Sequence, residues 1–71
     1  MLTGKRFRLK ITTLGIESND SGQVAVQVPA GSVVTVGSGP RARMVEVLWD
    51  ERNLVMFLED VQGRGELVSG A

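Results

Sequence analysis

The sequence predicts a small all-β protein, and three observations carry this prediction. Val occurs eleven times among 71 residues, whereas Ala, the best helix former, occurs only four times. Apolar and polar residues alternate in several short segments, as expected for strands with one buried face. Nine Gly residues supply the tight turns that such strands need. The length suits one domain, so we expect residues 1–71 to form a single β-domain.

The first half of the chain predicts two strands separated by a long loop. Strict alternation over residues 5–11 predicts the first strand, with Phe7, Leu9 and Ile11 between Arg6, Arg8 and Lys10. The segment 12–22 predicts a long loop or irregular hairpin tip, because its second half is dense in turn-forming residues. Residues 23–28 alternate again and predict a strand. Pro29 ends this strand, because proline cannot donate to a β-ladder.

The second half of the chain predicts a hairpin and a short closing strand. Strands are expected over residues 32–36, 43–49, 54–58 and 66–68, with a loop over 37–40. The polar turn 50–53 joins two apolar runs and predicts a β-hairpin. A single helix over 44–58 is the alternative, which the polar break and the Val content disfavour. One short 3₁₀ turn over 59–62 is expected before the last strand.

This order of strands and turns resembles that of the SH3-like β-barrel family. In that family a first strand leads into a long loop, three meandering strands follow, and one 3₁₀ turn precedes a short closing strand. Residues 7–11 would form the first strand, 12–28 the long loop with its own hairpin, and 50–53 the tight distal turn. The resemblance implies a five- to six-stranded SH3-like barrel. An OB-like or other small five-stranded barrel is the alternative.

The best-known activity of this family is the binding of proline-rich peptides in a groove lined by aromatic side chains. The chain has no Tyr, and residues 10–12 at the end of the first predicted strand are Lys-Ile-Thr rather than aromatic. The single Trp, Trp49, comes at the end of a strand rather than at its start. The resemblance therefore implies a fold and not this peptide-binding function.

Catalytic chemistry is disfavoured by the residues that the sequence lacks. There is no His and no Cys, which removes the commonest acid–base groups, nucleophiles and zinc ligands. The adjacent acids Asp50 and Glu51, like the pair at 59–60, would point to opposite faces of a strand. The Gly-rich segment 37–40 lacks the Gly-Lys-Ser/Thr ending of a phosphate loop. We therefore expect a non-enzymatic protein with no metal or cofactor.

Basic residues provide one functional alternative. The first sixteen residues carry four positive charges, and the rest of the chain balances them to a net charge of zero. Basic side chains on one face of a strand are spaced about 6.8 Å apart, close to the phosphate repeat of a nucleic-acid strand. No aromatic residues are interleaved to stack bases. The alternative is a weak nucleic-acid-binding module that uses Arg6, Arg8, Lys10, Arg41 and Arg43.

Protein–protein contact is the expectation that we favour, because the predicted hairpin 43–58 is apolar on both faces. One small barrel buries only one face of each strand, and surplus apolar surface usually marks an interface. We therefore expect a homo-oligomer or a stable protein partner. The candidate interface residues are Met44, Leu48, Trp49, Leu54, Met56 and Leu58. With no signal-like or membrane-spanning apolar stretch, we expect a cytoplasmic protein without membrane contact.

Overall fold

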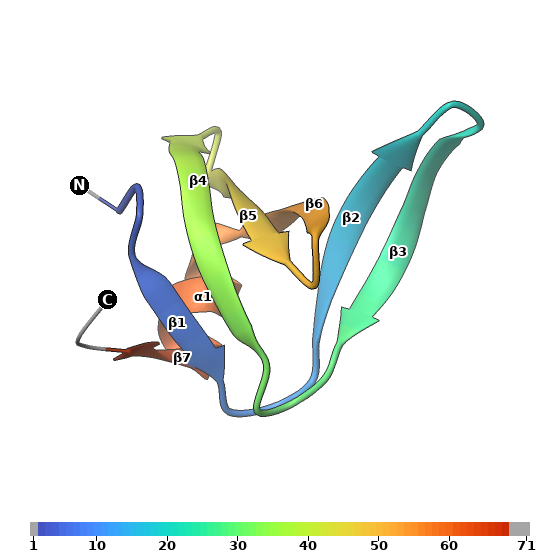
Figure 1. The fold of residues 1–71 in the computed structure, drawn as a ribbon. Coiled ribbons are helices and arrows are strands. Elements are labelled where there is room, and N and C mark those ends of the chain that lie inside the picture. The colour runs from blue at the N-terminus through green and yellow to red at the C-terminus, as the bar shows by residue number, and fades with distance from the viewer. Residues whose placement is uncertain (1, 69–71) are drawn as a thin grey trace.

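The computed structural model describes residues 2–68, which form seven β-strands and one short helix (Figure 1). The strands are β1 (Arg6–Leu9), β2 (Thr13–Asn19), β3 (Gly22–Val28), β4 (Val33–Arg41), β5 (Met44–Trp49), β6 (Arg52–Phe57) and β7 (Gly65–Val68). They form one antiparallel sheet in the order β3-β2-β6-β5-β4-β1-β7, so β3 and β7 are its edges. The prediction of an all-β protein is confirmed, with seven strands in place of five to six.

The segment predicted as a long loop contains a regular hairpin. Strands β2 and β3 pair from Thr13 opposite Val28 to Asn19 opposite Gly22, and a two-residue turn joins them. The sequence pattern does not predict β2, because the middle one of its inward-facing positions is occupied by Gly15 rather than by an apolar side chain. A Cβ at Gly15 would lie 3.1 Å from Cδ1 of Leu54, so this glycine permits a close approach of the two strands.

Strand β4 is longer than expected and connects two parts of the sheet. It pairs with β1 near its start and with β5 over the rest of its length. The predicted loop 37–40 belongs to this strand, where two shifts of register follow Val36 and Ser38. Gly and Pro are tolerated in a strand at such irregularities, because a ladder hydrogen bond is already missing there.

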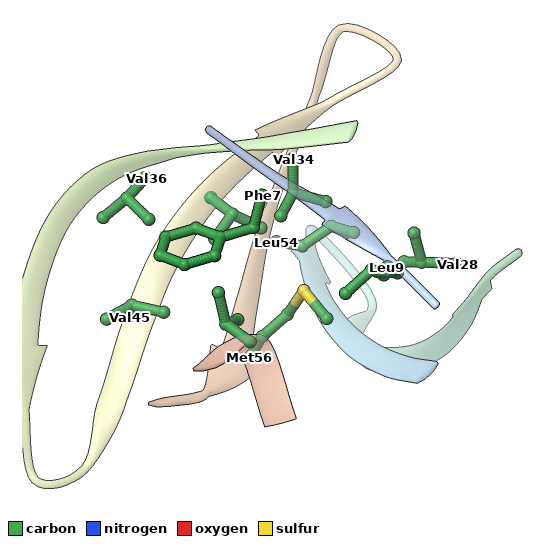
Figure 2. Packing of buried hydrophobic residues seen from close by; sticks show 10 residues of the cluster. Phe7, Leu9, Val28, Val34, Val36, Val45, Leu54 and Met56 are labelled. Carbon is green, nitrogen blue, oxygen red and sulfur yellow. The ribbon is translucent and has the colours of Figure 1, made fainter. Parts of the chain in front are cut away.

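One face of the sheet and one helical residue form the hydrophobic core (Figure 2). In Figure 2, the side chains of Phe7, Val36, Val45, Leu54 and Met56 extend into a common interior. The complete buried set is Phe7, Leu9, Val28, Val34, Val36, Val45, Val47, Leu54, Met56 and Val61. These residues alternate with exposed or half-buried positions along the strands, as expected for a sheet with one buried face.

The predicted 3₁₀ turn before the last strand is an α-helix, α1 (Leu58–Arg64). Val61 is fully buried and anchors this helix to the core. Glu59 and Asp60 lie in its first turn and Arg64 in its last, which suits the dipole of the helix. The helix leads directly into β7, which pairs with β1, so the two ends of the described chain lie side by side.

Candidate functional site: the outward face of the sheet

Exposed apolar side chains gather on the side of the sheet that faces away from the core. We call the surface formed by Leu14 and Ile16 of β2, Met44 and Leu48 of β5, and Val55 and Phe57 of β6 the outward face. Leu14 is 55% exposed, Phe57 54% and Leu48 47%, and the other three are half-buried. Large apolar side chains with this exposure are unusual when they occur together on one surface.

The strand register brings five of these six residues together, and Leu48 lies beyond Glu46 on β5, opposite Asn53. Ile16 is the partner of Val55 on β6, and Phe57 is the partner of Met44 on β5. Partners in an antiparallel pair lie on the same face, with their Cβ atoms about 5 Å apart. Two residues along from the Ile16–Val55 pair, the same register places Leu14 beside Phe57. The outward face is therefore continuous across three neighbouring strands.

Two open grooves lie on this surface and share Glu46 and Val55. The larger has a volume of about 500 Å³ and lies between Met44 and the end of the β4–β5 hairpin, residues 38–42. The smaller, of about 260 Å³, lies on the β2 side and includes Ile16 in its lining. Glu46 contributes the only carboxylate that lines either groove. Both grooves therefore combine apolar and polar lining, with Arg41 in the larger groove, Asn53 in the smaller, and Glu46 in both.

The candidate interface residues from the sequence divide between the two faces of the hairpin. Met44 and Leu48 lie on the outward face, half-buried and exposed respectively. Leu54 and Met56 belong to the core and are 1% exposed, which corrects their place in the candidate interface. The physical reason is their register, because Leu54 is the partner of the buried Val47 and therefore shares its inward orientation.

The other two candidates, Trp49 and Leu58, are half-buried and pack against the core. Trp49 ends β5 and is the partner of Arg52 across the β5–β6 turn. Leu58 begins helix α1, and its N–H donates to the carbonyl oxygen of Arg43 at 2.9 Å. Both residues therefore have structural roles at the margin of the core, and neither belongs to the outward face.

Sequence reasoning missed four members of the outward face: Leu14, Ile16, Val55 and Phe57. The first two fell in the predicted loop, although the pattern Leu14-Gly15-Ile16 has the alternation of a strand. The other two alternate with Leu54 and Met56 along one apolar run. Periodicity gives the spacing of the two faces of such a run but not which of them meets the core.

The structure divides the candidate nucleic-acid contacts into two groups. Arg6 and Arg8 lie on the side of β1 opposite to the buried Phe7, and Lys10 follows them. Arg6 is the partner of Thr35, whereas Arg41 lies six residues further along β4, about 20 Å away in an extended strand. Arg43 is in the same distal turn. The five basic side chains therefore do not form one stripe, and Glu66 is the partner of Arg8.

Other evidence on the site comes from chemistry and comparison. Among residues 2–68 no group of three or more acidic side chains could hold a metal ion. No helix in the described part of the chain is long and apolar enough to cross a membrane. Comparisons with protein-family models, with curated proteins and with solved structures found no match.

Proposed function

We propose that this protein is a non-enzymatic interaction domain that self-associates through its outward face. The observation that carries the proposal is the row of Leu14, Phe57 and Met44 across β2, β6 and β5, of which Leu14 and Phe57 are about half exposed. Ile16 and Val55 form the next row, and Leu48 lies beyond Glu46 on β5. Removing apolar surface from water yields about 25 cal/mol per Å². Covering a continuous apolar face with another protein therefore lowers the free energy of the system and favours association.

The composition of the outward face favours a second copy of the chain as the partner. Interfaces between identical subunits are more apolar than other protein contacts, and charged residues are depleted at their centres. Glu46 is the only charged residue between the apolar side chains of β2, β6 and β5 on this face. Phe57 and Met44, which are cross-strand partners, provide an aromatic and an adaptable side chain suited to such a centre.

We also propose that the fold is a barrel of the SH3-like type. Its support is the pairing order: β1 pairs with the last strand β7, and β4 pairs with both β1 and β5. A hairpin, β2–β3, occupies the long connection after the first strand, and a single helix precedes the last strand. In this proposal the outward face is the outer wall of the barrel formed by β2, β6 and β5.

The test compares two charge substitutions at equally exposed apolar positions. Phe57→Glu places a carboxylate in the outward face, whereas Leu67→Glu places one on edge strand β7, where Leu67 is also 54% exposed. By light scattering, we expect the unmodified protein and Leu67→Glu to share one mass above the 7.6 kDa of one chain. Phe57→Glu should have a lower mass.

A mass of 7.6 kDa for the unmodified chain would contradict the proposed self-association. Equal effects of the two substitutions would contradict the role of the outward face, since they would show a response to charge alone. Met44→Glu, at the cross-strand partner of Phe57, should reproduce the effect of Phe57→Glu.

A further inference from the structure

Edge strand β3 is unusually open to pairing with another strand. It is seven residues long, and none of its residues Gly22–Val28 is charged or proline. The opposite edge, β7, has four residues within the described part of the chain and carries Glu66. Natural sheets protect their edges with short strands, charges or proline, because unpaired N–H and C=O groups are a template for another chain. The edge at β7 has a charge, and the edge at β3 has none of these protections.

The free backbone groups of β3 can be assigned from the hairpin register. Asn19 and Gly22 are partners on either side of a two-residue turn, which makes them a hydrogen-bonded pair. Antiparallel partners alternate between hydrogen-bonded and non-hydrogen-bonded pairs. Counting from Gly22, the residues Gln23, Ala25 and Gln27 do not bond to β2, and their N–H and C=O groups point to the free edge.

The central five residues of β3 read the same in both directions about Ala25. Residues 23–27 are Gln-Val-Ala-Val-Gln, and the whole strand Gly22–Val28 is centred on Ala25. In an antiparallel pair of two such strands related by a two-fold axis at Ala25, Gln23 lies opposite Gln27 and Val24 opposite Val26. Each side chain of residues 23–27 then meets one of its own kind, and only the end pairs, Gly22 with Val28, are unlike. Self-complementarity of this kind is what a two-fold interface requires.

We propose that β3 pairs antiparallel with β3 of a second copy, around a two-fold axis through Ala25, and so joins the two sheets. This inference rests on the proposed self-association and adds a second contact to it, because strand pairing leaves the outward faces of both copies on the same side of the joined sheet. The central Ala25 pair and the two Gln23–Gln27 pairs are the hydrogen-bonded ones, so the edge groups of both strands are satisfied. This register pairs all seven residues of both strands, with Gln23 opposite Gln27 and Val24 opposite Val26.

The surroundings of β3 admit the second copy. In Figure 1, β3 forms the outer side of the β2–β3 hairpin, away from β1, β4 and β7. Val24 is 45% exposed and Val26 is half-buried, and the pairing covers both. The hairpin also carries two acids, Glu17 and Asp20. Antiparallel pairing places the two Asp20 turns about ten residues apart, roughly 33 Å, so like charges are not brought together.

The absence of Cys from the sequence permits a test of both pairing and register. Two single variants, Val24→Cys and Val26→Cys, are oxidised separately and as an equimolar mixture. In the proposed register a cysteine at 24 faces a cysteine at 26 of the other copy in a non-hydrogen-bonded pair, with Cα atoms about 4.5 Å apart. Identical cysteines are diagonal neighbours at about 7–8 Å, which is beyond disulfide range.

We expect the mixture to form at least about tenfold more covalent dimer than either variant alone, because only the mixed pair has disulfide geometry. Ala25→Lys, added to both variants, brings two ammonium groups together at the axis and should abolish the cross-link. Gln62→Lys adds the same charge on helix α1 and should leave it unchanged.

Efficient cross-linking of Val24→Cys or Val26→Cys alone would overturn the register about Ala25. If no sample forms covalent dimer while the unmodified protein has a mass above that of one chain, the β3 pairing is overturned and the proposed self-association stands. If the unmodified protein is also a monomer by mass, both proposals fail.

Discussion

Leu54 and Leu67 are two leucines on strands of the same sheet with opposite environments. Leu54 is 1% exposed in the core, and Leu67 is 54% exposed on edge strand β7. Leu54→Ala should lower the free energy of unfolding by about 2–5 kcal/mol, because it removes buried methyl groups and leaves a cavity. Leu67→Ala should change it by no more than about 0.5 kcal/mol. Urea denaturation measures both values, and similar losses would contradict the assignment of Leu54 to the core.

Two neighbouring glycines make a second prediction at the scale of single residues. A Cβ at Gly65 would lie 2.5 Å from the carbonyl oxygen of Val61 and 3.3 Å from Cβ of Phe7, so the backbone would have to move. Gly65→Ala should therefore destabilise the protein by about 1–3 kcal/mol. A Cβ at Gly63 meets no atom within 4 Å, and Gly63 lies in helix α1.

Gly63→Ala is the matched control for Gly65→Ala. It should stabilise the protein by up to about 1 kcal/mol, because alanine favours the helix over glycine. Thermal unfolding followed by circular dichroism gives the two shifts in Tm. Shifts of the same sign would show that the close approach of β7 to α1 does not exist as described.

The turns between elements carry backbone conformations that their residues do not favour. Asp50 and Glu51 join β5 to β6 with φ values of 51° and 62°, as a two-residue type I′ hairpin turn requires. Such left-handed conformations cost roughly 1 kcal/mol for a residue with a Cβ, and glycine avoids this cost. Glu51→Gly should therefore stabilise the protein by about 1 kcal/mol.

A glycine at a regular strand position provides the control for this turn. Glu66→Gly on β7 should destabilise the protein by about 0.5–1 kcal/mol, because glycine loses more conformational freedom on folding. Guanidinium denaturation of the two variants measures the difference. Destabilisation by Glu51→Gly would indicate that the side chain of Glu51 has a role that outweighs the backbone.

At the scale of elements, local patterns predicted the strands better than their pairings. Alternation located the strands at 5–11, 23–28, 43–49 and 54–58 to within a few residues. It failed at β2, where Gly15 replaces the expected inward side chain. It also extended the first strand to Ile11, which is 50% exposed beyond the end of β1. These features depend on contacts between distant segments, which periodicity does not contain.

The same limit applies to the candidate site. The sequence indicated that the hairpin 43–58 is apolar on both sides, and Met44 and Leu48 do lie outward. The choice between Leu54 and Val55 as the outward residue depends on pairing with β2, through Ile16. No local signal reveals that pairing, since it joins residues far apart in the chain.

At the scale of the whole molecule, the sheet is covered on one side only. Helix α1 supplies Val61 to the core, and no described element covers the outward face of β2, β6 and β5. The β2–β3 hairpin projects from the rest of the molecule and gives the described chain its long dimension of 37 Å (Figure 1). The projecting hairpin therefore carries the unprotected edge β3 and one of the three strands of the outward face, β2.

The response to salt distinguishes apolar self-association from binding to nucleic acid. Binding through Arg6, Arg8 and Lys10 would weaken steeply with salt, because phosphate contacts release counterions. Apolar contacts respond little to moderate salt, since screening acts on charges. The response of any assembly or complex to salt therefore identifies the forces that hold it.

Sedimentation equilibrium of the unmodified protein, at low and at moderate salt, tests the central proposal most directly. Burial of the outward face by a second copy predicts a mass of at least twice the 7.6 kDa of one chain, unchanged between the two salt concentrations. A mass of 7.6 kDa at both salt concentrations, over the whole range of protein concentration, would contradict the proposal that this domain acts through contacts with its own copies.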